Sequence, residues 1–155
     1  MIRLADLREE ISIELEAMAA DAAEAGLLLR EFACADVVPL RVTAAGTALL
    51  VDFYGALEAI LQQLHCYHGV VPPDGPDWRR KLLGCFMEPA CPPFPCLFTG
   101  PLLLELSALR VFRQAFCCNY GFRPGWTSVR EGLERLPQLC QKVTESLGAY
   151  ISRLH

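Results

Sequence analysis

The chain has 155 residues, a length that suits one hydrophobic core, and we expect a single domain over residues 1–155. Its formal net charge is -4 at pH 7, so no overall positive charge attracts this protein to nucleic acid. Any RNA or DNA contact must therefore come from a local patch. Hydrophobic residues make up 53% and charged residues 21%, a balance which suggests that a partner covers some apolar surface.

Targeting signals are missing from the sequence pattern. No uninterrupted apolar run reaches the roughly 20 residues that a membrane-spanning helix needs. The first ten residues are charged and amphipathic, without the basic start and apolar middle of a secretory signal. We therefore expect a cytoplasmic protein with no membrane contact.

Eight cysteines are spread along the chain: Cys34, Cys66, Cys85, Cys91, Cys96, Cys117, Cys118 and Cys140. The even count is compatible with disulfides, but the apolar mass is large enough to fold without them. We expect buried, reduced thiols that pack as small apolar side chains. The spacing of Cys91 and Cys96 is not that of a zinc knuckle, so no metal or cofactor is predicted, although zinc or disulfides stay open as the minority alternative.

The first predicted helix runs from about Leu4 to Phe32, because apolar residues recur there at steps of three and four. Its opposite face is acidic, which is typical of a solvated surface or of one that meets a basic partner. Residues 33–43 are expected to connect to a second helix, from about Ala44 to Tyr67. His65 and His68 close that helix, where the helix dipole favours a cation; a role as catalytic base is the alternative.

A short third helix is expected from about Asp77 to Met87, with Asp74 or Asp77 as its cap. Its apolar residues would point inward, and a basic triplet would point outward: Arg79, Arg80 and Lys81. The triplet is either a solvated face or a patch that follows phosphate groups.

Residues 88–100 are too rich in proline for a helix or a central strand. A fourth helix is expected from Thr99 or Pro101 through residue 120, and a last one from Thr127 or Ser128, kinked at Pro137. No stretch alternates with a period of two. The sequence therefore predicts an all-α bundle of four to five helices.

Several reactive side chains gather at the end of the fourth predicted helix. If the helix continues to residue 120, Arg113 and Tyr120 lie two turns apart on one face, and Gln114 and Cys118 form an i,i+4 pair. A guanidinium, an amide, a thiol and a phenol would then share one end of one helix. This pattern indicates either a phosphate site or a helix end with an incidental arginine.

The segment from Phe112 to Tyr120, followed by Trp126, resembles the Arg-x4-His-x-Tyr signature of the HEPN superfamily, in particular its HepT-like ribonuclease toxins. Three other segments are similar to motifs of that family: residues 52–58, 75–83 and 133–137. The resemblance covers most of the chain beyond residue 43 and implies an HEPN-like bundle.

The resemblance also implies a function. Members dimerise, cleave RNA without metal or cofactor, and are restrained by a nucleotidyltransferase-type antitoxin in a type VII-style toxin–antitoxin pair. The resemblance places the catalytic residues at Arg113, Cys118 and Tyr120, with Tyr120 also a possible site of inactivating modification. RNA phosphate contacts are expected from Gln114, Asn119, Arg79, Arg80 and Lys81.

One position departs from the family pattern, because Cys118 stands where the signature has histidine. Metal-free RNA cleavage needs a base for the ribose 2′-hydroxyl and a cation for the phosphorus centre. Arg113 suits the second task, whereas a thiol, with an ordinary pKa of ~8.5, is a poorer base. The sequence thus leaves three hypotheses: an active ribonuclease toxin, a catalytically degenerate module that dimerises and binds the antitoxin-type partner, and a helical scaffold with a cysteine-rich metal site.

Overall fold

The computed structural model describes residues 2–155, and within that range the chain forms five helices and no strand. Their bounds are α1 Leu4–Glu31, α2 Leu40–His68, α3 Trp78–Gly84, α4 Gly100–Cys118 and α5 Trp126–Ile151. The predicted all-α bundle is therefore confirmed, with an architecture consistent with an HEPN-like fold.

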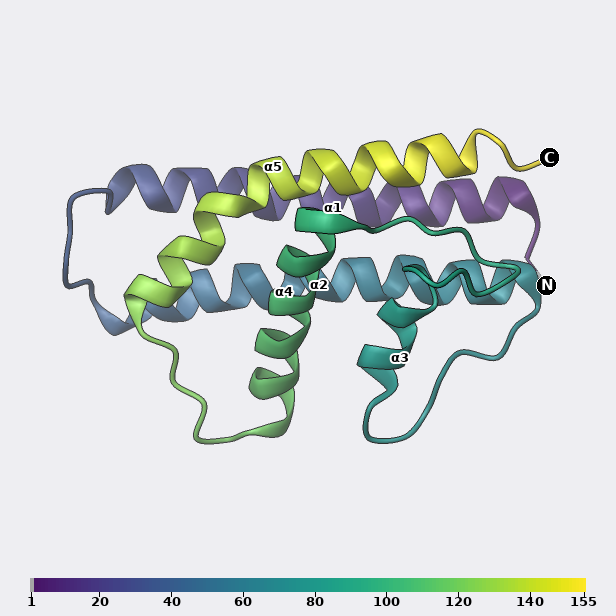
Figure 1. Cartoon of the computed structure of the whole chain (residues 1–155). Coiled ribbons are helices and arrows are strands. Elements are labelled where there is room, and N and C mark those ends of the chain that lie inside the picture. Colours follow the sequence, from purple (N-terminus) through teal and green to yellow (C-terminus); the bar gives the residue numbers. More distant parts are fainter. Residues whose placement is uncertain (1) are drawn as a thin grey trace.

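Helix α2 is the centre of the bundle, because it packs against each of the other four helices. Figure 1 shows α1 and the C-terminal half of α5 side by side along α2, while α4 crosses in front of α2 and the short α3 lies against α2 next to it. The largest fully buried side chains include Phe53 and Tyr54 of α2, and Phe86 and Phe98 of the segment between α3 and α4. Helices α3 and α4 therefore cover one face of α2 together.

Helix boundaries differ from the predicted ones at several ends. Helix α2 begins at Leu40 rather than at residue 44, since Pro39 suits the position before a first turn and Val42 already packs in the core. It ends at His68, because Gly69 has a left-handed φ of 68° that stops the helix. Helix α3 ends at Gly84, three residues earlier than expected.

The predicted end of α4 at residue 120 is wrong. The helix stops at Cys118, because Asn119 has extended backbone angles of φ −132° and ψ 101°. Tyr120 therefore lies in the turn that follows the helix, and it does not share a helical face with Arg113.

Of the two predicted caps, the one of α3 has the expected position and the one of α5 is wrong. Asp77 occupies the cap position of α3 without a capping side-chain hydrogen bond, and α5 begins at Trp126, one residue before Thr127. Pro137 lies inside α5, and Figure 1 shows this helix changing direction midway along its length, as expected for an internal proline.

Among residues 2–155, α2 is the one helix long and apolar enough to cross a membrane. Most of its apolar stretch is buried inside the bundle, which is typical of the core helix of a soluble fold.

The cysteines are less buried than predicted. All eight are free, but only Cys140 is buried, whereas five are exposed: Cys34, Cys66, Cys91, Cys117 and Cys118. The apolar mass of leucine and phenylalanine fills the core, so the thiols are left at its edge. The described residues contain no group of three potential metal ligands.

Candidate functional site

A buried carboxylate, Glu58 on α2, holds two arginines from two other helices. Its Oε1 accepts a 2.5 Å hydrogen bond from Nε of Arg113 on α4, and its Oε2 lies 3.1 Å from Nε of Arg79 on α3. The Glu58 side chain is only 5% exposed. A charge at this depth needs such partners, so this cluster of Glu58, Arg79 and Arg113 ties α3 and α4 to α2.

The orientation of Arg113 is set by α2. Its Nη1 donates a 2.9 Å hydrogen bond to the carbonyl oxygen of Val51, in addition to the Nε contact with Glu58. Gly55 provides the space, because a Cβ atom there would lie 2.8 Å from Nη1. The Arg113 side chain is still 23% exposed, and Nη2 has no hydrogen-bond partner among the described residues. One edge of this guanidinium therefore remains available to a ligand.

Arg79 points inward, contrary to the prediction that the whole basic triplet faces solvent. Its side chain is 12% exposed, and its guanidinium carbon lies 4.4 Å from the ring centre of Trp78. The buried charge of Glu58 is the physical reason, because the apolar face of α3 packs on α2 next to that carboxylate. The Nε–H of Arg79 does not aim at Oε2, so the contact is an ion pair and not a hydrogen bond.

A polar chain continues from Arg79 along α4. Arg79 Nη1 donates a 2.9 Å hydrogen bond to Oε1 of Gln114, and Gln114 Nε2 lies 3.1 Å from Sγ of Cys118. The predicted i,i+4 pair of Gln114 and Cys118 is therefore confirmed. It sits on the exposed side of the cluster, so Cys118 is accessible to a ligand held there.

Asn119 and Tyr120 form the turn beyond α4. The Asn119 side chain accepts a 3.1 Å hydrogen bond from the backbone N–H of Gly121, which closes the turn. Tyr120 is fully exposed. The structure thus groups Arg113, Gln114 and Cys118 with Arg79, while the phenol lies outside that contact network.

The outer members of the basic triplet are shared with an acid. Arg80 and Lys81 lie 2.7 and 3.1 Å from the two carboxylate oxygens of Asp77, and both side chains are more than half exposed. Exposed pairs of this kind are weak, so both cations stay available for an anion.

The electrostatics of the cluster favour anions. Burial raises the pKa of Glu58 above its usual value, while Arg113 and Arg79 oppose that shift. Burial and the Glu58 charge also raise the pKa of Tyr54, so this phenol stays protonated. Two guanidinium groups face one carboxylate, and Arg80 and Lys81 lie on the same short helix as Arg79. The local charge is positive in a chain whose net charge is negative.

Neither histidine of α2 joins the site. His65 is 1% exposed, packs 4.2 Å from the ring centre of Phe94, and has no hydrogen-bond partner on either ring nitrogen. Burial lowers the pKa of His65 and also that of His68, which disfavours the cationic helix-end role predicted for both. His68 instead forms a 2.7 Å hydrogen bond with the hydroxyl of Tyr150.

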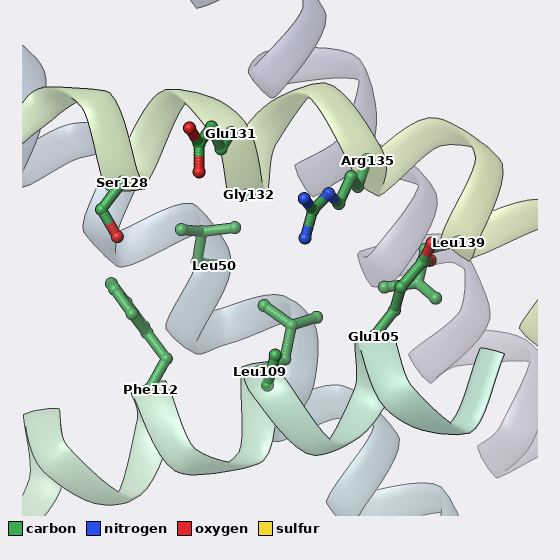
Figure 2. Close-up of a pocket in the computed structure, with 10 residues that line it drawn as sticks. Leu50, Glu105, Leu109, Phe112, Ser128, Glu131, Gly132, Arg135 and Leu139 are labelled. Carbon is green, nitrogen blue, oxygen red and sulfur yellow. The ribbon is translucent and has the colours of Figure 1, made fainter. Parts of the chain in front are cut away.

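A separate cavity of about 170 Å³ lies between α4 and α5. Figure 2 shows Ser128, Glu131 and Arg135 on the α5 side, above Leu109 and Phe112 of α4. Its lining also includes Glu105, and the two carboxylates outnumber the single arginine. This charge balance is unfavourable for a phosphodiester, so the candidate site is the arginine cluster and not this cavity.

Sequence reasoning missed three residues of the site: Glu58, Gly55 and Val51. A detectable signal existed for Glu58, which is one of only two acids in the apolar α2. Gly55 contributes by leaving room for the Arg113 guanidinium, and Val51 contributes its backbone carbonyl. Nothing in these two residue types indicates such a role.

The chain was compared with family models, curated proteins and solved structures. A family model for HepT-like proteins matches residues 45–154, a range that contains Glu58, Arg79, Arg113 and the end of α4. No curated protein and no solved structure matches the chain.

Proposed function

This chain belongs to the HepT-like protein family, and we propose that it is a HepT-like toxin that cleaves RNA without a metal ion. The observation that carries the proposal is the Arg113 guanidinium, fixed by Glu58 with one edge open, together with the exposed thiol of Cys118, which Gln114 and Arg79 link to the same cluster. A fixed guanidinium with a free N–H edge is well suited to the oxygens of a phosphodiester.

In the proposed reaction, the ribose 2′-oxygen attacks phosphorus and its proton passes to the Cys118 thiolate. The bond from phosphorus to the 5′ oxygen breaks, which leaves a 2′,3′-cyclic phosphate and a free 5′-hydroxyl. We assign the exposed phenol of Tyr120 as the acid that donates a proton to the leaving 5′ oxygen. The phenol then regains a proton from the Cys118 thiol through solvent. Arg113 stabilises the charge at phosphorus, and Gln114, Asn119, Arg79, Arg80 and Lys81 are assigned to binding the RNA.

Partners are part of the same proposal. The protein would act in the cytoplasm as a homodimer and pair with a nucleotidyltransferase-type antitoxin. The exposure of Tyr120 supports its role as the group that such a partner modifies, because no part of the bundle covers it. Exposed apolar residues support a covering partner: Leu40, Val111 and Phe116 are each about half or more exposed.

A second candidate function is favoured by Cys118 and by the histidines. Cys118 replaces the signature base, and His65 and His68 make their contacts with Phe94 and Tyr150, away from the cluster. The chain would then be a degenerate module that keeps the bundle, the dimer and the partner but does not cleave RNA.

The test is RNA cleavage by purified protein in excess chelator, compared with Arg113→Ala and Arg113→Lys. The toxin proposal expects cleavage by the parent, loss in Arg113→Ala and at most partial recovery in Arg113→Lys. Intact RNA with the parent, together with cleavage by Cys118→His, would establish the degenerate module instead. Intact RNA in every sample would reject ribonuclease chemistry at this site.

A further inference from the structure

A cleft between α3 and α4 lies beside the arginine cluster. Its volume is about 160 Å³, and it is lined by Pro76, Asp77, Arg79, Arg80, Arg110 and Gln114. Figure 1 shows α3 and α4 on the same side of α2, and they contact each other there. Three guanidinium groups against a single carboxylate give this cleft a positive charge.

Arg110 is the arginine of the cleft that has no partner among the described residues. It is partly exposed, and it makes no hydrogen bond or ion pair with any other residue from 2 to 155. By contrast, Arg79 is bound to Glu58 and Gln114, and Arg80 is paired with Asp77. A cation that lines a cleft without an internal partner is free to bind an external anion.

The position of Arg110 on α4 connects the cleft to the proposed reaction centre. Arg110, Gln114 and Cys118 recur at intervals of four, so they form one strip along the helix. Gln114 contacts both Arg79 and Cys118. The strip extends about 12 Å from Arg110 to Cys118, at a rise of ~1.5 Å per residue.

We propose that the cleft between Arg80 and Arg110 binds a second phosphate of the RNA, on the α3 side of the bond that is cleaved. The inference rests on the proposed function for the identity of the ligand as RNA. Arg110 is then a binding residue that fixes the direction of the strand along α4, and it does not take part in bond breaking.

The experiment measures the dissociation constant of a fluorescent single-stranded RNA over a series of salt concentrations. Arg110→Ala should weaken binding about tenfold and reduce the salt slope by ~0.7, the value for one lost phosphate contact on a single strand. Arg110→Lys should keep most of the slope, because the charge remains. Arg130→Ala is the matched control, a partly exposed arginine on α5 outside the cleft, and should bind like the parent.

The binding readout separates this inference from the proposed cleavage. If the parent binds RNA with the Arg110-dependent slope but cleaves nothing, the phosphate subsite stands and the ribonuclease proposal falls. An Arg110→Ala protein with unchanged affinity and unchanged slope would overturn the subsite, even if the parent cleaves RNA. A parent protein without measurable RNA affinity would overturn it as well.

Discussion

Arg113 and Glu58 are 55 positions apart in the chain, yet the guanidinium Nε of one lies 2.5 Å from the carboxylate Oε1 of the other. Because Glu58 also holds Arg79, a single acid on α2 fixes the arginines of both α3 and α4. The candidate site therefore depends on a residue whose side chain is buried beneath it.

Replacing that acid should loosen the site and the fold together. Glu58→Gln leaves two arginines without a counter-charge, and we expect a loss of about 1.5–3 kcal/mol in the free energy of unfolding. Urea denaturation measures it. The control is Glu134→Gln, which removes an exposed partner of Arg130 and should cost less than about 1 kcal/mol. Equal losses in the two variants would contradict a special role for the buried acid.

Gly55 offers a way to move Arg113 without changing any charge. In Gly55→Ala the new methyl group would lie 2.8 Å from Nη1, so the guanidinium must shift away from its contacts with Glu58 and Val51. We expect a smaller loss of stability than in Glu58→Gln but RNA cleavage as low as that of Arg113→Ala, measured by thermal unfolding and by RNA cleavage in excess chelator. Gly148→Ala in α5, where nothing lies within 4 Å, should affect neither site nor binding and should stabilise the helix by about 0.5–1 kcal/mol. Parental RNA cleavage in Gly55→Ala would show that the position of Arg113 is unimportant.

His65 should make the fold sensitive to acid. Its pKa is lowered by burial in the folded state, so the unfolded chain binds a proton first as the pH falls below about 6.5. The contribution of neutral His65 to the free energy of unfolding is therefore present above that pH, and it is lost as the pH falls toward the folded-state pKa. His65→Leu should reduce the loss of stability between pH 7 and 5, leaving the part due to His68, whose pKa is also lowered by burial. It should add about 1 kcal/mol at pH 7 because two unpaired ring nitrogens disappear.

The companion variant for this experiment is His68→Leu. It removes the 2.7 Å hydrogen bond to Tyr150, so it should lower the melting temperature at pH 7. If both variants shift the melting temperature in the same direction at pH 7, the difference that we assign to the two histidines is wrong.

Asp21 should have the opposite pH dependence. Burial and the nearby Asp52 carboxylate raise its pKa from 3.8 to about 6. Since the folded state holds this proton more tightly than the unfolded chain does, stability should fall as the pH rises from about 4 to 6. Asp21→Asn should raise the melting temperature at pH 7 and flatten the curve in that window. Asp74→Asn, at an exposed loop position, is the control and should follow the parent curve.

Much of the fold was accessible from the sequence, because long apolar periods define α1, α2 and α5 almost to their ends. The candidate site was only partly accessible. The pairing of Gln114 with Cys118 follows from helical spacing alone, whereas the inward turn of Arg79 depends on a carboxylate 21 positions earlier on another helix. Spacing also failed for Tyr120, since the helix end at Asn119 is set by local backbone angles and a turn that the pattern does not encode.

The turn after α4 separates two side chains that the family pattern joins in one motif. Tyr120 projects from a short loop closed by Asn119 and Gly121, while Arg113 is anchored more than a helical turn away on the core side. If the proposed partner attaches a nucleotide to this phenol, it needs to contact only the loop. Under the proposed function, such a group would add negative charge to the loop, and the guanidinium that we propose to stabilise a phosphate would attract that charge.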